Sequence, residues 1–127
     1  MAVMFHFQTL DVYKRAAEFL PLAYSLAVGT GGELAGQLRR AALSLNLNIA
    51  EGTGRLGRDE RRFFITARGS AFECAAILDA MIELGMADTR ISNGHALLHR
   101  IVSMLTKMIG STPTPTPTRI NTTEPWG

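Results

Sequence analysis

Several features of secreted and membrane proteins are absent from this sequence. Its 127 residues include a single cysteine, Cys74, so no disulfide can form within the chain and a reducing compartment is expected. The longest uncharged run before the proline-rich C-terminal segment, from Phe19 to Gly32, has 14 residues and contains Pro21, whereas a membrane-spanning helix needs about 20. The first residues contain no basic segment followed by a long apolar run, so no secretion signal is expected. These absences predict a cytoplasmic protein without a membrane partner.

A large excess of charge of one sign is also lacking. Thirteen Lys and Arg residues against eleven Asp and Glu residues leave a net charge of +2, which by itself is too small to predict nucleic-acid binding. The hydrophobic fraction of 46% is enough to fill a core, and the length suits a single domain. Composition therefore bounds the fold more closely than the function.

Proline is nearly absent from the first 110 residues and is concentrated near the end of the sequence. Four of the five prolines lie in the last 15 residues, three of them in the alternating Thr-Pro tract of residues 112–118. Such a tract favours an extended polyproline II conformation and cannot build a core. We therefore expect a folded domain over residues 1–110 and a disordered Pro/Thr-rich tail over residues 111–127.

Helical periodicity dominates the predicted domain, and no alternating strand pattern of useful length is present. Apolar residues recur at steps of three and four in four segments, separated by glycines that are typical helix stops. The expected helices start near Asp11, at Glu33, after Gly57 and at Ser92, which can cap the last of them. Four helices with short connections predict an all-α, up-and-down four-helix bundle.

The second predicted helix has an apolar line outside its core stripe. Leu43, Leu47 and Ala50 form this line, beside the core positions Leu45 and Ile49. A helix that is apolar on more than one side is usually covered by more than one neighbour. We therefore predict a homo-oligomer; the alternative is a second helix that lies centrally within a monomeric bundle.

Three patterns that are associated with enzymes or cofactors have a simpler structural interpretation. Residues 52–57 match G-x-G-x-x-G, but they follow a predicted helix rather than a strand, so we interpret them as a helix-to-helix corner and not as a dinucleotide site. His95 and His99 are four residues apart, but their helix contains no third metal ligand. Cys74 lies on an apolar helix face, where a thiol is normally a small buried hydrophobe. The sequence thus predicts no catalytic residues, no cofactor and no metal.

Polar residues line one face of the second predicted helix and the adjacent face of the third. They are Arg40, Asn48 and Glu51 on the second helix, and Arg68, Ser70 and Glu73 on the third, which must run antiparallel beside it. Charges so close to apolar positions need partners if they are buried. We expect a hydrogen-bonded network in which one of the glutamates pairs with one of the arginines and fixes the register of the two helices. The alternative is a solvated polar face.

Arginine is the residue type whose distribution points to a partner. Residues 39–68 contain seven arginines against three acidic residues. Four of the seven, Arg55, Arg58, Arg61 and Arg62, cluster at the predicted corner between the second and third helices. Guanidinium groups grip phosphate oxygens bidentately, and an oligomer would repeat the patch. The pattern predicts contact with the backbone of RNA or DNA; a merely solvated helix end is the alternative.

Sequence motifs in the same region resemble those of a known bacterial family. Residues 37–44 (QLRRAALS) and 48–55 (NIAEGTGR) resemble the signature of four-helix-bundle proteins encoded in intervening sequences of bacterial large-subunit ribosomal RNA genes. The likeness covers about residues 8–110. It implies a bundle that assembles into a closed homo-oligomeric ring, expected to be a pentamer, without known catalytic residues. Relatives include accessory proteins of diversity-generating retroelements, which bind nucleic acid and a reverse transcriptase through basic surfaces.

The sequence therefore leads to two competing hypotheses of function. The first is a non-enzymatic oligomeric scaffold that contacts nucleic-acid backbone through the four corner arginines. The second is an oligomeric protein–protein adaptor whose arginines only keep it soluble. Nucleic acid that binds in a strongly salt-dependent way would favour the first hypothesis.

Overall fold

The computed structural model describes residues 4–111 of the chain. Within this range the chain forms one short 3-10 helix, four α-helices and no strand. They are η1 (His6–Thr9), α1 (Asp11–Thr30), α2 (Gly32–Thr53), α3 (Gly57–Glu83) and α4 (Thr89–Ser111). The prediction of an all-α fold is therefore confirmed. The predicted tail over residues 111–127 lies outside the described residues, apart from Ser111 at the end of α4.

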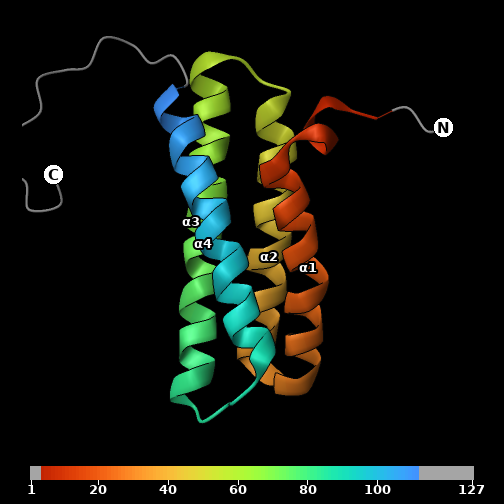
Figure 1. Ribbon diagram of the computed structural model, residues 1–127, viewed down its shortest axis with the longest axis vertical. Coiled ribbons are helices and arrows are strands. Elements are labelled where there is room, and N and C mark those ends of the chain that lie inside the picture. The colour runs from red at the N-terminus through yellow and green to blue at the C-terminus, as the bar shows by residue number, and fades with distance from the viewer. Residues whose placement is uncertain (1–3, 112–127) are drawn as a thin grey trace, which may run out of the picture.

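The four α-helices form an up-and-down bundle (Figure 1). Each helix packs against the next one along the chain, and α4 packs against α1, so the bundle closes on itself. One end of the bundle holds η1, the α2–α3 connection and the last turn of α4 (Figure 1). We call it the corner end, and we call the opposite end, with the α1–α2 and α3–α4 connections, the far end.

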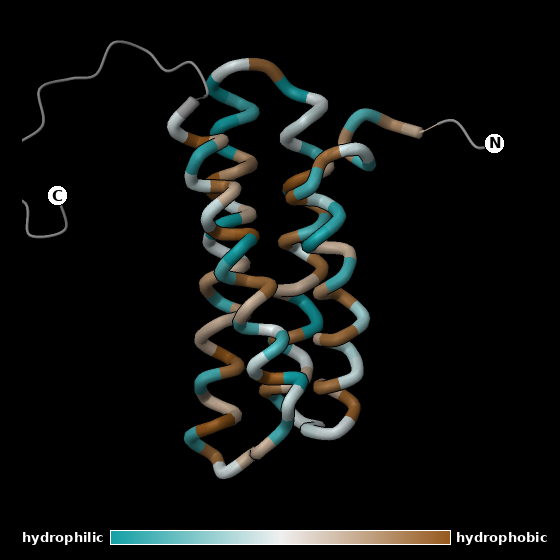
Figure 2. Tube along the Cα trace, viewed as in Figure 1, coloured by the Kyte–Doolittle hydropathy of each residue, from teal (hydrophilic) through white to brown (hydrophobic). Residues whose placement is uncertain are grey.

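The core consists of apolar residues that recur along each helix at intervals of about one turn (Figure 2). Phe19 of α1, Leu45 of α2, Leu78 of α3 and Leu105 of α4 are fully buried. Burial of a side chain of this size stabilises the fold by about 1.5–3 kcal/mol, so packing rather than helix propensity holds the bundle together. Within residues 4–111, no helix combines the length and the apolarity that crossing a membrane requires.

The helix boundaries follow the glycines, but the cap of the last helix differs from the one expected. Gly85 ends the turn after α3 with a φ of 90°, a conformation that glycine adopts without strain. The prediction that Ser92 caps the last helix is wrong, because α4 already begins at Thr89. Asp88 accepts a 2.8 Å hydrogen bond from the backbone N–H of Arg90, and it also binds the Arg90 side chain at 2.6 Å. This charged cap, one turn earlier, takes the place assigned to Ser92.

Candidate nucleic-acid interface

The connection between α2 and α3 is shaped by its glycines. Gly57 begins α3 with a φ of 56°, in the left-handed region that favours glycine. Gly52 lies in the last turn of α2, where an added Cβ would be only 2.7 Å from Cε1 of Phe64. Gly57 lets the chain turn, and Gly52 lets α3 approach α2 closely. Residues 52–57 therefore form a helix-to-helix corner, as their sequence context indicated.

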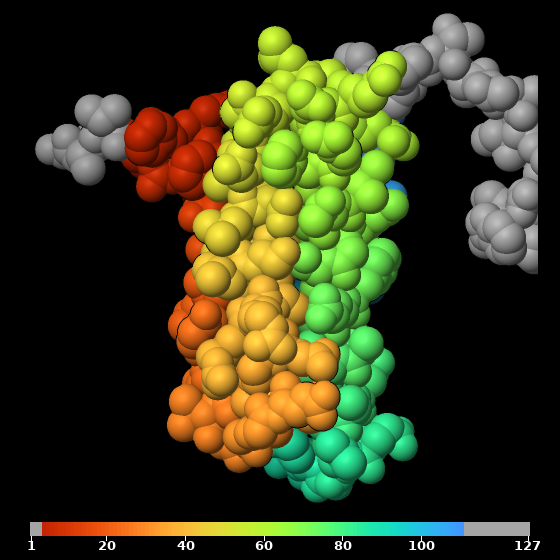
Figure 3. All heavy atoms as spheres, turned by 180° about the vertical axis from the view of Figure 1, so that it is seen from behind, coloured from red at the N-terminus to blue at the C-terminus, as the bar shows by residue number. Residues whose placement is uncertain are grey.

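This corner brings the four predicted arginines together at one end of the bundle. Arg55 lies in the turn itself, and Arg58, Arg61 and Arg62 lie in the first two turns of α3. Arg61 is half-buried, whereas the other three side chains are exposed. Figure 3 shows this region, in yellow-green, as the end of the molecule with protruding side chains. The corner end thus presents several guanidinium groups to solvent.

Two of these arginines have acidic partners within the chain. Arg55 Nη2 is 3.2 Å from Glu51 Oε2, and Arg62 Nη2 is 3.6 Å from Asp59 Oδ1. All four side chains of these pairs are at least half exposed, and such pairs contribute only about 0–1 kcal/mol. The other two arginines have no ionic partner in the part of the chain that the structure describes. A phosphate group could therefore bind here without breaking a strong internal interaction.

Charge is distributed unevenly along the bundle axis. The half at the corner end contains the first halves of α1 and α3 and the second halves of α2 and α4. Counted over residues 4–111, its nine basic and five acidic residues leave a charge of +4, whereas three basic and five acidic residues in the other half leave −2. The residues of the positive half are Lys14, Arg15, Arg55, Arg58, Arg61, Arg62, Arg68, Arg100 and Lys107, against Asp11, Glu18, Glu51, Asp59 and Glu60. Arg100 lies at the middle of α4, and we count it in the positive half because it is 3.7 Å from Asp11 at the start of α1.

The three-dimensional patch differs from the continuous segment that the sequence suggested. Arg39 and Arg40, which the sequence grouped with the corner arginines, lie in the first half of α2 and therefore toward the far end. Lys14 and Lys107, which are remote in the sequence, belong to the same half as the corner. The positive surface is thus a property of one end of the bundle and not of residues 39–68 as such.

The polar network between α2 and α3 is smaller and less charged than expected. The hydroxyl oxygens of Ser44 and Ser70 are 2.9 Å apart and join the two helices. Asn48 Nδ2 donates hydrogen bonds to the Ser44 backbone oxygen at 2.8 Å and to its hydroxyl at 3.1 Å. Neutral side chains therefore form the link between these two helices.

The expected pairing of a glutamate with an arginine across the two helices is replaced by other contacts. Glu51, near the end of α2, pairs with Arg55 in the turn that follows, four residues further along the chain, and both side chains are about half exposed. Arg68 Nη1 donates a 3.2 Å hydrogen bond to Thr106 of α4 instead. Neither Arg40 nor Glu73 has a hydrogen-bonded or ionic side-chain partner within residues 4–110. Both are exposed, so water solvates them.

The lone cysteine is placed for packing rather than for chemistry. Cys74 is fully buried on α3. Burial, with a smaller contribution from the charge of Glu73, raises the pKa of its thiol to about 12. Because the thiolate is the reactive form, this cysteine is inert near neutral pH.

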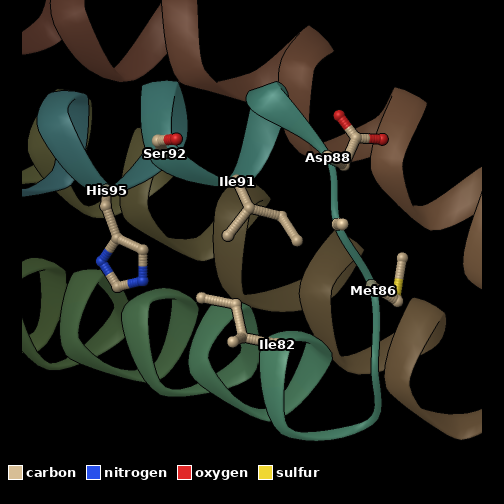
Figure 4. Close-up of a pocket in the computed structure, with 7 residues that line it drawn as sticks. Ile82, Met86, Asp88, Ile91, Ser92 and His95 are labelled. Carbon is tan, nitrogen blue, oxygen red and sulfur yellow. The ribbon is translucent and has the colours of Figure 1, made fainter.

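One histidine of the pair, His95, contacts a carboxylate of the neighbouring helix. His95 Nε2 is 2.9 Å from Asp79 Oδ1 on α3, and no group of three potential ligands gathers among residues 4–110. At the far end, a pocket of about 410 Å³ is lined mainly by apolar side chains, with Asp88, Ser92 and His95 among its walls (Figure 4). Both of its charged or ionisable side chains are already engaged, Asp88 by Arg90 and His95 by Asp79.

Aromatic side chains at the corner end are the feature that sequence reasoning missed. The rings of Phe5 and Phe7 are stacked, with centroids 5.9 Å apart and planes 9° apart. Phe7 also meets Tyr13 edge-on at 4.8 Å, and the guanidinium of Arg55 lies 5.3 Å from the ring centroid of Phe63. The sequence contains a signal, because aromatics recur in residues 5–13 and 63–64. Only the antiparallel packing shows that these two segments share one end.

By its fold the protein is an all-α, up-and-down four-helix bundle, and comparisons with known proteins show which family it belongs to. A family model described as 23S rRNA-intervening sequence protein matches residues 8–107, and the chain belongs to this family. A similar solved structure is that of a protein of unknown function from the S23 ribosomal protein family of Bacteroides thetaiotaomicron. It has a TM-score of 0.73 and 19% sequence identity, over 79% of this chain and 99% of that chain, so it shows the fold alone. The search of curated proteins gave no match.

Proposed function

We propose that this protein is a non-enzymatic, cytoplasmic oligomeric scaffold that contacts the backbone of RNA or DNA through the corner end of its bundle. The observation that carries the proposal is the separation of charge, with +4 on the corner-end half and −2 on the other. A positive end attracts a polyanion and orients it toward one surface. Arg55 lies in the α2–α3 turn at this end, and Arg58, Arg61 and Arg62 lie in the first two turns of α3.

Contact with the backbone, rather than with base edges in a groove, fits the geometry of this surface. Arg55, Arg58 and Arg62 are exposed at a helix corner, and each of the four α-helices of residues 4–111 lies within the bundle rather than extending from it as a helix in a major groove would (Figure 1). Phosphate contacts position a nucleic acid without reading its sequence. We therefore expect binding that tolerates many sequences and weakens steeply with salt.

Self-assembly is the second part of the proposal, and exposed apolar side chains support it. Leu47 on the outer face of α2 is 55% exposed, and the neighbouring Leu43 is 40% exposed. A second apolar surface lies between α3 and α4, where Phe72, 55% exposed, and Val102 line a notch of about 170 Å³. Two different patches on one chain are what a head-to-tail contact needs, and such contacts can close into a ring. A pentamer would repeat the positive end five times around its axis.

The same apolar surfaces favour the competing function, an oligomeric protein–protein adaptor. Exposed leucine and phenylalanine side chains of this kind mark contact sites for other proteins as well as for further copies of the chain. In that case the arginines keep the assembly soluble, and nucleic acid does not bind to them.

A salt series on nucleic-acid binding distinguishes the two functions. The experiment measures fluorescence anisotropy of labelled RNA and DNA with wild-type protein and with a variant in which Arg55, Arg58, Arg61 and Arg62 are all changed to Gln. We expect micromolar binding at about 50 mM salt that falls steeply as salt rises, and loss of binding in the variant. Light scattering must show the same assembled mass for both proteins. An intact oligomer that binds neither RNA nor DNA at about 50 mM salt would leave the adaptor as the function.

A further inference from the structure

Most of the aromatic side chains lie at the same end of the bundle as the positive charge. Of the nine Phe, Tyr and Trp residues in the sequence, five belong to the corner end, namely Phe5, Phe7, Tyr13, Phe63 and Phe64. Phe64 is buried in the core, but the others are at least partly accessible. A basic surface interleaved with aromatic rings is typical of proteins that bind unpaired nucleotides.

Phe5 is held in position although its ring faces solvent. Its side chain is 71% exposed, and one face of the ring is stacked on Phe7. The backbone N–H of Phe5 donates a 2.7 Å hydrogen bond to Oε1 of Gln8, which fixes the start of η1. Phe7 is anchored in turn by its edge-on contact with Tyr13 of α1. Phe5 is thus a preformed platform, and little conformational entropy is lost when a flat ligand stacks on it.

This platform lies at the same end of the bundle as the positive surface. The short helix η1 packs against both α1 and α2, at the end of the bundle where α2 runs into the corner (Figure 1). On the other side of that corner, Arg55 lies over the ring of Phe63, and its side chain is half exposed. A planar guanidinium supported in this way offers a second flat surface on which a base can stack.

We infer that the nucleic acid bound at the corner end is single-stranded, with unpaired bases stacked on Phe5 and on the Arg55 guanidinium while phosphates contact the arginines of α3. This inference rests on the proposed function. A duplex buries the faces of all its bases except at the two terminal pairs, so along its length it presents only backbone and groove edges and can use neither platform. A single strand exposes both its phosphates and its base faces, and this corner has a surface for each. RNA and DNA share this chemistry.

The test compares single-stranded RNA, single-stranded DNA and a blunt DNA duplex of the same length, about 20 nucleotides, by anisotropy at about 50 mM salt. Phe5→Leu keeps an apolar side chain but removes the ring, and Phe5→Tyr keeps the ring. Val28→Ala is the control, because Val28 is 84% exposed at the far end of α1. We expect Phe5→Leu to weaken single-strand binding about tenfold, while Phe5→Tyr and Val28→Ala change it less than about twofold. Duplex binding should be weaker and insensitive to all three changes.

A second readout detects stacking directly. The chain has one tryptophan, Trp126, which lies outside the described residues. In a Trp126→Phe background, Phe5→Trp places the single fluorophore at the platform, and stacking of a base on it should quench its emission with single strands but not with the duplex.

The outcomes separate the inference from the proposed function. If single strands and duplex bind equally well and Phe5→Leu binds like wild type, the stacking inference is wrong while backbone binding stands. If none of the three nucleic acids binds, the proposed function is wrong, and the inference is wrong with it. If Phe5→Leu reduces the affinity for single-stranded RNA and for single-stranded DNA equally, bases of both nucleic acids stack on Phe5.

Discussion

Gly52 provides a quantitative test of how α2 and α3 pack at the corner. A Cβ at this position would lie 2.7 Å and 2.9 Å from two ring carbons of Phe64 and 3.0 Å from Cβ of Phe63. The Phe63 Cβ is tied to the α3 backbone, so the clash is not relieved by a side-chain rotation alone. Overpacking of this kind costs about 1–3 kcal/mol, whereas replacing a helical glycine with alanine gains about 0.5–1 kcal/mol. We predict that Gly52→Ala lowers the free energy of unfolding by about 1 kcal/mol, the difference between these two effects.

The chain contains a matched control for this change. Gly69 lies within α3 and is exposed, and apart from its chain neighbours and the nearby backbone of its own helix, no atom lies within 4 Å of the position that a Cβ would occupy. Gly69→Ala should therefore show only the propensity gain and stabilise the fold by about 0.5–1 kcal/mol. Urea unfolding at equal protein concentration measures both variants, since assembly makes apparent stability depend on concentration. A Gly52→Ala protein as stable as Gly69→Ala would refute the close packing of the two helices.

Three further predictions concern other parts of the bundle. Ser70→Ala removes the 2.9 Å hydrogen bond to Ser44 between α2 and α3, and urea unfolding should show a loss of about 0.5–1.5 kcal/mol; no loss would mean that the serine pair does not link the helices. Hydrogen bonds from Arg90 lower the pKa of Asp88 from 3.8 to about 2. The ionised Asp88 carboxylate therefore stabilises the fold above pH 3.8, and this contribution is lost as the pH falls through about 2. Asp88→Asn should therefore show a smaller fall in Tm than wild type over this pH range, and an identical fall would contradict the assignment. Cys74, whose pKa is about 12, should react with a thiol reagent at pH 8 only after denaturation, and rapid labelling of the native protein would show that it is not buried.

The fold could be predicted from local signals because each of them acts over a few residues. The apolar repeat of three and four residues places Leu38, Leu45 and Ile49 on one side of α2, and all three are fully buried. Gly31, Gly57 and Gly85, one at each connection between the α-helices, have positive φ values that do not continue a right-handed helix. The cap of α4 was placed incorrectly because Ser92 and Asp88 are both good cap residues, and the choice depends on the ion pair with Arg90.

The candidate site could be predicted only in part, because its remaining features depend on contacts between distant segments. The clustering of the corner arginines could be predicted, because all four lie within eight residues of sequence at the connection between two predicted helices. The partners of Arg68 and His95, Thr106 and Asp79, lie on neighbouring helices, and periodicity alone does not reveal which residues meet across a bundle. The position of Phe5 at the corner end likewise depends on the antiparallel packing of α1 and α2.

We propose that the corner end, and not positive charge in general, binds the nucleic-acid backbone. The most direct measurement is the salt dependence of anisotropy for two double variants that remove the same charge, Arg58→Gln with Arg62→Gln at the corner end and Arg39→Gln with Arg40→Gln toward the far end. The slope of log K against log salt is negative, and each lost phosphate contact reduces its magnitude by about 0.7–0.9. We predict a slope reduced by about 1.5 for the corner variant and an unchanged slope for the other. Equal slopes for the two variants would contradict a binding site at the corner end.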